Sequence, residues 1–382
     1  MGSIRSELES AGLVFPDFRR SNVEVAKEVA KGDGALIGNG RSKLFFLTID
    51  ALGYDLLEKA VAKSRLLKSV FGKGSLERIS TVFPSFTPTV FTSIDSGLLP
   101  SEHGIIGSPL PIKEYGALRD IFGVSWWPAA NEDSVVLFPQ PKTVLQMAKH
   151  KGFFYLQDEK IVRKSEKADA MKSIRVLPYI SQDDFVFQAR KLAKTARLVY
   201  AYIWELDHVQ HVYTKTAKQG FEVVTYLLER LAEKVIPYLK EEGWRIVITS
   251  DHGQLSTKRK DAIFLGPNSK IMQDLAMPPW GTESTMFFEV TESREKSFET
   301  RFGQHFGNRF LLYDSEEAIR SGLFGRSYVK PALRYRFGTY VAISKGGYTF
   351  RYVPPGSTIG KFGLGHHGGL TKEEMQIPLL IL

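Results

Sequence analysis

The chain has 382 residues, enough for two or three domains at about 150 residues each, and its 43% hydrophobic and 24% charged residues form an ordinary globular composition. It contains no cysteine, so disulfide bonds, thiolate catalysis and thiolate metal sites are excluded, and any metal must be bound by nitrogen and oxygen. The 51 Lys and Arg residues exceed the 42 Asp and Glu residues, and this net charge of +9 suits anionic partners but also simply favours solubility.

The distribution of charge and hydrophobicity narrows the choice of partner and location. Positive residues are scattered rather than gathered in one tract, so we expect a small phosphate-bearing substrate and no dedicated nucleic-acid partner. No apolar run approaches the roughly 18 residues that a membrane-spanning helix needs, so no membrane partner is expected. The N-terminal residues lack a basic start followed by an apolar stretch, which predicts a cytoplasmic protein. The oligomeric state is not indicated.

Predicted strands and helices alternate from residue 43 onward. In chain order we expect a strand at 43–50, a helix at 54–63, a strand and Pro-broken turn leading into a short helix at 79–97, a helix at 141–152, a strand at 153–157, a helix at 183–197, a strand at 198–207, a helix at 221–242 and a strand at 244–251. The first strand, KLFFLTID, is an apolar run of the kind buried inside a parallel sheet. The alternation predicts an α/β fold with helices on both faces of the sheet.

The sequence changes character at about residue 263. Between 263 and 350 the segments are short, aromatic and β-like, separated by Gly and Pro, with one short helix among them. We interpret 263–350 as an inserted, cap-like α+β subdomain. The remainder divides into an N-terminal helical extension at 1–40 and an α/β core made of 41–262 and 351–382.

Three predicted strands end on acidic residues, Asp50, Asp207 and Asp251. In open α/β sheets, ligands bind beyond the carboxyl ends of the strands, so these three carboxylates are expected at one edge. Each of them alone could be a turn or cap residue. The residues that follow Asp207 and Asp251 favour a functional role instead.

Histidines accompany two of these acids. His211 follows Asp207 by four residues, which puts both side chains on one face if a helical turn begins at Asp207. His252 follows Asp251 directly, and the two can hold one ion only if the backbone turns sharply, which Gly253 permits. Mixed carboxylate and imidazole ligands suit Zn²⁺, and Mn²⁺ accepts the same donors.

A third source of imidazoles is the GHHGG stretch near the C-terminus, which contains His366 and His367. An isolated histidine is more often a surface or core residue than a ligand, but half or more of the eight histidines fall in these motifs. The number of ligands suggests two divalent ions, since a set of six results: Asp50, Asp207, His211, Asp251, His252 and one of His366 and His367. Two ions about 3.5–4 Å apart can clamp the attacking and leaving oxygens of a phosphoryl displacement.

The segment FPSFTPTVFTS offers hydroxyl nucleophiles. Thr87 precedes a Pro at the expected first turn of a helix, where the helix N-terminus favours anions and a metal can activate a hydroxyl. Ser85 and Thr89 are rivals. Thr87 could equally be a plain helix cap with no catalytic role.

Five segments resemble, in order, the motifs of the alkaline phosphatase superfamily, and most closely those of its type I phosphodiesterase/nucleotide pyrophosphatase family. They are FFLTIDALGYDLL, TVFPSFTPTVFTSIDSGLLPSEHGIIG, AYIWELDHVQHVY, VITSDHGQ and GHHGGLTKEEMQIPLLI, and they span roughly residues 43 to 382. The resemblance implies a three-layer α/β/α core sheet of the alkaline-phosphatase type. It also implies a phosphoric-ester hydrolase.

The resemblance implies roles for individual residues. The family's first metal site falls on Asp207, His211 and His367, and its second on Asp50, Asp251 and His252, with the oxygen of Thr87. The family's nucleophile lies ten residues before the Gly of the SG pair, here Gly97, and this selects Thr87. His367 is favoured over His366 because it directly precedes Gly368.

Two features depart from the family pattern. Where nucleotide pyrophosphatases carry an Asn soon after HGI, this sequence has Ser108, a weaker donor to a phosphate oxygen. No Lys or Arg occurs between Thr87 and His103, so the nucleophile helix lacks a phosphate-binding cation. Both features bear on substrate preference rather than on the type of reaction.

The expected function is hydrolysis of phosphodiester or pyrophosphate bonds in nucleotide-type substrates, with two divalent ions and a phosphothreonine intermediate on Thr87. The alternatives are a phosphomonoesterase or a phosphate-transferring mutase of the same superfamily. A non-catalytic nucleotide-binding or nucleic-acid-binding module is a further alternative. A sulfatase is disfavoured, because it would need a modified Cys or Ser at the nucleophile position.

Overall fold

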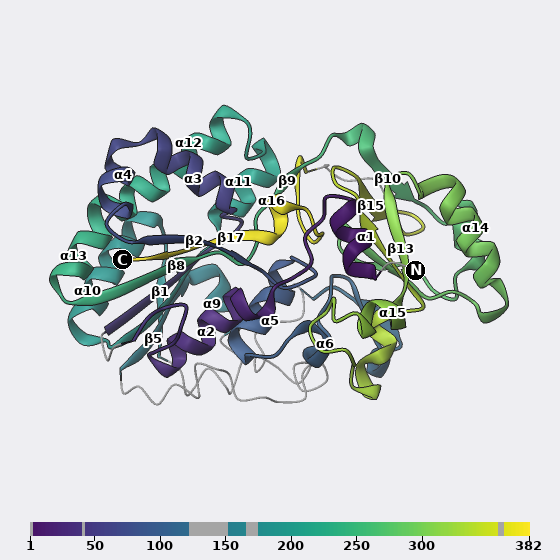
Figure 1. Cartoon of the computed structure of the whole chain (residues 1–382), viewed down its shortest axis with the longest axis horizontal. Coiled ribbons are helices and arrows are strands. Elements are labelled where there is room, and N and C mark those ends of the chain that lie inside the picture. Colours follow the sequence, from purple (N-terminus) through teal and green to yellow (C-terminus); the bar gives the residue numbers. More distant parts are fainter. Residues whose placement is uncertain (1–2, 40–42, 122–151, 166–174, 358–362) are drawn as a thin grey trace.

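The computed structural model describes residues 3–39, 43–121, 152–165, 175–357 and 363–382, and its centre is a seven-stranded sheet (Figure 1). The strand order is β2 (Ser75–Ser80), β17 (Gln376–Ile381), β8 (Trp244–Thr249), β1 (Lys43–Ile49), β7 (Leu198–Ile203), β5 (Phe153–Asp158) and β6 (Arg175–Tyr179). Neighbouring strands are parallel, except that β17 runs antiparallel to β2 and β8.

Both faces of this sheet are covered, because side chains of the apolar strands alternate between them. In β1, Phe45, Leu47 and Ile49 enter one hydrophobic core, and Leu44 and Phe46 enter the other. The first core is closed by α3 (Tyr54–Lys63), α4 (Arg65–Phe71), α10 (Gln182–Thr195), α12 (Lys218–Arg230) and α13 (Ile236–Glu241). The second is closed by α2 (Asn22–Lys31), α5 (Thr87–Ser96) and α9 (Glu159–Ser165). The predicted three-layer α/β/α architecture is confirmed.

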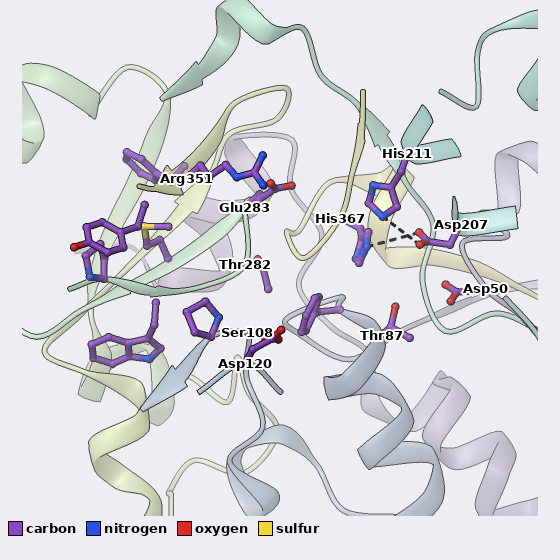
Figure 2. Close-up of a pocket in the computed structure, with 18 of the residues that line it drawn as sticks. Asp50, Thr87, Ser108, Asp120, Asp207, His211, Thr282, Glu283, Arg351 and His367 are labelled. Carbon is purple, nitrogen blue, oxygen red and sulfur yellow. Dashed lines mark hydrogen bonds and ion pairs between the residues drawn. The ribbon is translucent and has the colours of Figure 1, made fainter. Parts of the chain in front are cut away.

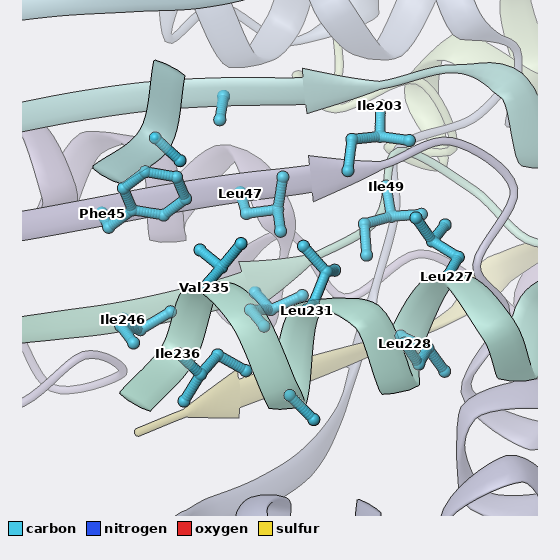
Figure 3. Close-up of a cluster of buried hydrophobic side chains, with 14 of the residues drawn as sticks. Phe45, Leu47, Ile49, Ile203, Leu227, Leu228, Leu231, Val235, Ile236 and Ile246 are labelled. Atoms are coloured by element: carbon cyan, nitrogen blue, oxygen red, sulfur yellow. The ribbon is translucent and has the colours of Figure 1, made fainter. Parts of the chain in front are cut away.

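The helix predicted at 221–242 is interrupted. A π-helical turn at Leu231–Val235 separates α12 from α13, just before Pro237. Proline has no N–H to donate and its ring crowds the carbonyl four residues earlier, so a wider turn absorbs the conflict. The apolar side of the whole segment still packs on β1, β7 and β8 (Figure 3), where a fully buried Leu contributes about 1.5–3 kcal/mol.

The strand predicted at 198–207 is too long. β7 ends at Ile203, and Asp207 lies in the first turns of α11 (Glu205–Tyr213). The apolar run covers only 198–204, and the acidic side chains that follow favour the positive N-terminal end of a helix over a strand. Asp207 therefore does not end a strand. The helix predicted at 141–152 falls outside the described residues except for its last position.

A second lobe lies beside the sheet (Figure 1). It contains the antiparallel sheet β11 (Trp280–Gly281), β12 (Thr285–Phe288), β14 (Tyr340–Ser344) and β13 (Phe310–Asp314), the helices α14 (Glu295–Phe306) and α15 (Ser315–Arg320), and the parallel pair β10 (Ala262–Leu265) and β15 (Thr349–Tyr352). Its core also takes in α1 (Ile4–Ser10) and the hairpin of β3 (Leu110–Ile112) with β4 (Ala117–Arg119), which lie outside 263–350. The proposed domain boundaries stay a prediction.

The helices differ in burial, since α5 is buried on all sides whereas α12 buries one apolar face. Across the described ranges, none has both the length and the apolar character that crossing a bilayer requires.

Candidate active site

The predicted acidic and imidazole residues meet at the carboxyl ends of the sheet strands. Asp50 directly follows β1, and Asp251 and His252 follow β8. His367 arrives on the loop after β16 (Gly365–His366), a strand that pairs with β9 (Leu255–Ser256). Figure 2 shows Asp50, Asp207, His211 and His367 grouped on one side of a pocket, with Thr87 below them.

The first group of possible metal ligands is Asp207, His211 and His367. One carboxylate oxygen of Asp207 lies 3.1 Å from Nε2 of His211, and the other lies 3.7 Å from Nε2 of His367. The first contact follows from their spacing of four residues on α11, which puts both side chains on one helix face. The second joins residues 160 positions apart, and only the fold creates it.

The second group is Asp50, Asp251 and His252, and all three are buried. Nε2 of His252 lies 3.6 Å from Oδ1 of Asp50 and 3.3 Å from Oδ2 of Asp251. Among the described residues, neither of these two carboxylate oxygens has a hydrogen-bond partner. Leaving a buried carboxylate oxygen unpaired is costly, so this group is chemically suited to a cation.

The three histidines share one orientation. Their Nδ1 atoms face backbone carbonyl oxygens, that of His211 at 2.7 Å from Gly365, that of His252 at 2.9 Å from Gly253 and that of His367 at 3.2 Å from Ser85. A carbonyl oxygen only accepts, so each Nδ1 carries a proton, and Nε2 is the ring nitrogen that the neutral imidazole has left to bind a metal. A donated Nδ1–H is how proteins orient imidazoles that bind metals.

His366 is placed differently from His367. Its Nδ1 contacts the Glu283 carboxylate and its Nε2 lies 2.8 Å from the carbonyl oxygen of Gly363. Both ring nitrogens therefore face other protein groups, and His366 is not in either ligand group. The geometry brings His367 to the site and leaves His366 behind it.

Mutual proximity shifts the pKa values of these groups in opposite directions. Burial raises the pKa of Asp50 well above its usual range, and the carboxylates of Asp251 and Asp207 raise it further. Burial alone would also raise the pKa of Asp207, but the facing imidazole of His211 lowers it overall. Burial alone would lower the pKa of His211, but Asp207 raises it to about 9. Strongly shifted groups at a cleft are typical of a functional site.

Thr87 is the first residue of α5, as the Thr-Pro pair predicts. Its Oγ1 lies 2.9 Å from Nε2 of His252, which places the hydroxyl at the second ligand group. Of its two rivals, Ser85 donates its hydroxyl to the carbonyl of Gly369 at 2.8 Å, and Thr89 is fully buried. Neither rival lines the pocket, whereas Thr87 does.

Ser108 lines the pocket, but on the opposite side from Asp50 and Thr87 (Figure 2). Its hydroxyl donates to the carboxylate of Asp120 at 2.6 Å and accepts from the N–H of Ile121 at 3.0 Å. The hydroxyl proton is therefore directed at Asp120 rather than at the ligand groups.

Several residues that hydrogen-bond the candidate metal-binding side chains were not singled out from the sequence. The hydroxyl of Tyr202 donates to Oδ2 of Asp50, and Nε2 of Gln254 donates to Oδ1 of Asp207 at 2.8 Å. The hydroxyl of Ser250 donates to the carbonyl of His252 at 2.6 Å. Gln254 and Ser250 flank the DHG motif, and this adjacency was the available signal; Tyr202 gave none, because it reads as an ordinary strand residue.

The backbone is tight around the ligands. Ala51 has a left-handed φ of 56°, uncommon for a residue with a side chain, and its N–H donates to Oδ1 of Asp251 at 3.1 Å. Gly253 does not adopt a left-handed φ. Instead, a Cβ there would lie 2.0 Å from the carbonyl oxygen of Glu373 in α16 (Lys372–Met375). The role of Gly253 is close packing rather than an unusual turn conformation.

The pocket has a volume of about 740 Å³ and extends from the ligand groups to the second lobe. The second-lobe wall includes the aromatic residues Trp280, Phe350 and Tyr352. Two cationic residues also line it, Lys160 on α9 and Arg351 on β15, and Arg351 lies beside Glu283 (Figure 2). A cleft of this size and lining can hold a small organic ligand.

Comparison with solved structures finds the same fold in two enzymes. Murine ectonucleotide pyrophosphatase/phosphodiesterase 5 matches with a TM-score of 0.66 at 16% identity, covering 88% of this chain and 87% of that one. An inactive threonine-to-alanine variant of it in complex with AMP matches with a TM-score of 0.64 at 17% identity, with the same coverage. Phosphonoacetate hydrolase from Sinorhizobium meliloti 1021, in complex with phosphonoformate, matches with a TM-score of 0.65 at 18% identity, covering 89% and 90%.

Comparison with curated protein sequences finds no match. The family model described as type I phosphodiesterase / nucleotide pyrophosphatase, however, matches residues 44–116 and 126–368, which is most of the chain. The first four of the five segments that carry the resemblance lie wholly within these matched residues. The fifth, GHHGGLTKEEMQIPLLI, is matched only at its start. The chain therefore belongs to the type I phosphodiesterase / nucleotide pyrophosphatase family, a family of phosphoric-ester hydrolases.

Proposed function

We propose that this enzyme cleaves phosphodiester or pyrophosphate bonds of nucleotide-type substrates, with Thr87 as the nucleophile and two divalent ions as cofactors. The observation that carries the proposal is the position of the Thr87 hydroxyl, 2.9 Å from Nε2 of His252 at the start of α5. A hydroxyl at a helix N-terminus, next to two sets of carboxylate and imidazole ligands, is suited to attack on phosphorus.

The residues present fit two divalent ions. Asp207, His211 and His367 would hold one, and Asp50, Asp251 and His252 the other. The buried, unpaired oxygens of Asp50 and Asp251 support this assignment, as does the orientation of the histidines, whose Nδ1 atoms face backbone carbonyls and leave Nε2 for a metal. When bound, such ions supply positive charge that lowers the pKa of a hydroxyl and stabilises a leaving oxygen. The donor set suits Zn²⁺, and Mn²⁺ accepts it as well.

The protein groups would act in a defined order. Thr87 loses its hydroxyl proton to solvent, Oγ1 bonds to phosphorus, and the bond from phosphorus to the leaving oxygen breaks, so that the leaving group departs with that oxygen and takes up a proton. The product is a phosphorylated Thr87, which in the case of a diester still carries the retained nucleotide group on phosphorus. Water then attacks the same phosphorus and frees Thr87. The N-terminus of α5 favours the negative charge of the phosphorylated state throughout. The inactive threonine-to-alanine variant among the structural neighbours supports a threonine in this role.

The pocket supports a nucleotide-type substrate. Its aromatic second-lobe wall is suited to a flat base, and Lys160 and Arg351 are suited to further phosphate groups. The AMP complex of a structural neighbour supports the same substrate class. Because the hydroxyl proton of Ser108 is directed at Asp120, Ser108 is proposed only as a wall residue that meets the substrate indirectly.

A phosphomonoesterase or a phosphate-transferring mutase would use the same ligand groups and the same nucleophile. A non-catalytic binding module would not need Thr87.

The cytoplasmic location stays a prediction, and small phosphate esters remain the proposed partners.

A substrate panel tests the proposal. A nucleotide diester, a dinucleotide, a nucleoside triphosphate and a phosphomonoester are compared in the presence of Zn²⁺, of Mn²⁺ and of chelator. We expect metal-dependent turnover with higher kcat/KM for the diester or pyrophosphate substrates. After acid quenching, the peptide containing Thr87 should carry a transient added mass, that of the retained nucleotidyl group with a diester and that of a phosphate with the monoester. Faster turnover of the monoester would favour the monoesterase, and no turnover of any substrate with both ions bound would contradict the proposal.

A further inference from the structure

The N-terminal segment before β1 contacts the catalytic centre, although it lies outside the residues that the family model matches. Its contact residue is Asn22, the first residue of α2, which is fully buried. Neither the family motifs nor the predicted ligand set includes this residue. The role of Asn22 must therefore be inferred from its contacts.

The side-chain amide of Asn22 holds the loop that carries two ligands. Its Nδ2 lies 3.1 Å from the backbone carbonyl oxygens of Ser250 and Asp251, and 3.1 Å from Oγ1 of Thr81. The amide thus hydrogen-bonds the turn between β8 and His252, and Asn22 and Asp251 are 229 positions apart in the sequence. Buried amide donors with defined acceptors restrict the conformation of the backbone that they bind.

The rest of α2 connects this contact to the nucleophile helix. Val25 and Val29 are buried in the same core cluster as Val90 and Ile94 of α5. Ser21 caps α2 by accepting from the N–H of Glu24 and also forms a β-bridge with Ser80. One helix therefore packs against the element that presents Thr87 and hydrogen-bonds the loop that presents Asp251 and His252.

Upstream of α2, the segment reaches the loop that carries His367. The N–H of Val14 donates to the carbonyl of Leu370 at 2.7 Å, just beyond the GHHGG stretch. Leu8 and Leu13 are buried in the core of the second lobe. Figure 1 accordingly shows α1 in the second lobe and α2 beneath the sheet beside α5.

We propose that Asn22 is a positioning residue for the Asp50, Asp251 and His252 group, and that the N-terminal segment is part of the catalytic centre. The inference rests on the proposed function, since it assumes that this group binds a divalent ion. Asn22 itself touches neither ion nor substrate. It fixes the backbone of the loop, so that Asp251 and His252 keep the spacing that one ion requires.

The test compares Asn22→Ala and Asn22→Asp with Val29→Ala in the full-length chain. Val29 is a matched control, because it is buried on the same helix but its apolar side chain cannot hydrogen-bond the loop that carries Asp251 and His252. For each variant we would measure Zn²⁺ and Mn²⁺ affinity by competition with a chromogenic chelator, the Tm of the metal-free protein, and kcat and KM. Affinity and Tm separate positioning from general destabilisation.

We expect both Asn22 variants to lose about 10–100-fold in affinity for one of the two ions and a similar factor in kcat, with little change in KM. Asn22→Asp should be at least as impaired as Asn22→Ala although it is isosteric, because its carboxylate faces two carbonyl oxygens and cannot donate to them. Val29→Ala should lower the metal-free Tm while the affinity for both ions stays within about twofold.

Three outcomes decide the inference. Asn22 variants that bind both ions as tightly as the parent overturn it. So does a Val29→Ala variant that loses as much affinity as they do, since the effect would then be one of stability. A parent protein that binds no second ion contradicts the proposed function instead, and the affinity of the parent distinguishes the two failures.

Discussion

Two regions of this molecule bury carboxylates, and they do so in opposite ways. In the second lobe, fully buried Asp274 accepts from Nε of Arg301 at 2.8 Å and from the hydroxyl of Ser297 at 3.1 Å. At the sheet edge, the buried carboxylates of Asp50 and Asp251 face each other, each with one oxygen that no described residue bonds. The cation that pairs with Asp274 is a side chain of the protein, Arg301, whereas no Lys or Arg among the described residues pairs with Asp50 or Asp251.

The comparison separates a structural carboxylate from a ligand. A buried charge is stable only when its partners are supplied, so Asp274 stabilises the lobe around α14 through groups that fold with it. The unpaired oxygens of Asp50 and Asp251 keep a local cost in the metal-free protein, and a bound cation would remove it. The histidines divide in the same way. His103 contacts Ser93 and Ile105 with its two nitrogens, whereas His252 directs Nε2 at the site.

The largest expected effect is at Thr87, the proposed nucleophile. Thr87→Ala should lower kcat by about 10⁴-fold or more, roughly 5 kcal/mol, because the attacking oxygen is removed, while both ions stay bound. Thr87→Ser keeps the oxygen and should retain much of the activity. Steady-state kinetics and metal analysis check this, with Thr89→Ala as the control. An inactive Thr89→Ala protein beside an active Thr87→Ala protein would show that the nucleophile is misassigned.

Asp251→Asn tests the ligand side of the comparison. We expect loss of one ion per chain and a fall in kcat of at least about 100-fold, because the variant removes an ionic ligand. The metal-free protein should have an unchanged or higher Tm, since a like charge beside Asp50 disappears. Metal content by mass spectrometry and thermal unfolding in chelator give the two readouts. A large drop in metal-free Tm would mean that Asp251 is structural.

Asp274→Asn tests the structural side. This change should destabilise the protein by about 2 kcal/mol, because Arg301 and Ser297 lose an ionised acceptor, with metal content unchanged. Denaturant unfolding checks the free energy of unfolding, and the same samples give metal content. If Asp274→Asn loses metal as Asp251→Asn does, the two regions are not distinct.

The stability of the metal-free protein should depend on pH through the protonation of His211. Its pKa is raised to about 9 in the folded protein, from about 6.5 when unfolded, so the folded state binds the extra proton between these values. The stabilisation is present below about pH 6.5 and is lost as the pH rises to about 9. We expect Tm in chelator to fall over that window, and the fall to be smaller in His211→Gln.

His103 provides the control for this pH experiment. Burial lowers the pKa of His103 to about 3, with Arg336 adding to the effect, so its contribution to stability changes only between about pH 3 and 6.5. His103→Gln should therefore leave the slope above pH 6.5 as it is in the parent. An equal flattening in both variants would count against His211 as the source.

The smallest expected effect is at Ser108. Because its hydroxyl proton is donated to Asp120, Ser108→Ala should change kcat/KM for nucleotide substrates by less than about threefold, or roughly 0.6 kcal/mol. Kinetics with a diester and a monoester check this. A loss of tenfold or more, with metal content intact, would place Ser108 in direct contact with the substrate.

Local signals in the sequence were enough for most strands of the sheet and for part of the site. The apolar runs of β1 and β8 predict buried parallel strands, and Asp50 and Asp251 follow from where those runs end. The spacing of Asp207 and His211 predicts a shared helix face, although α11 begins earlier than expected. These features depend on neighbours in the chain, and so periodicity and spacing report them.

Only the tertiary structure decided which groups meet across the chain. It put Nδ1 of His367 against the carbonyl of Ser85 and Nδ1 of His366 against Glu283. It also attached Tyr202 to Asp50 and brought Asn22 from the N-terminal segment onto the loop of Asp251. None of these contacts has a periodicity or a motif. Each joins residues with a large separation in sequence, and their proximity depends on how helices and strands pack, which single-sequence patterns do not encode.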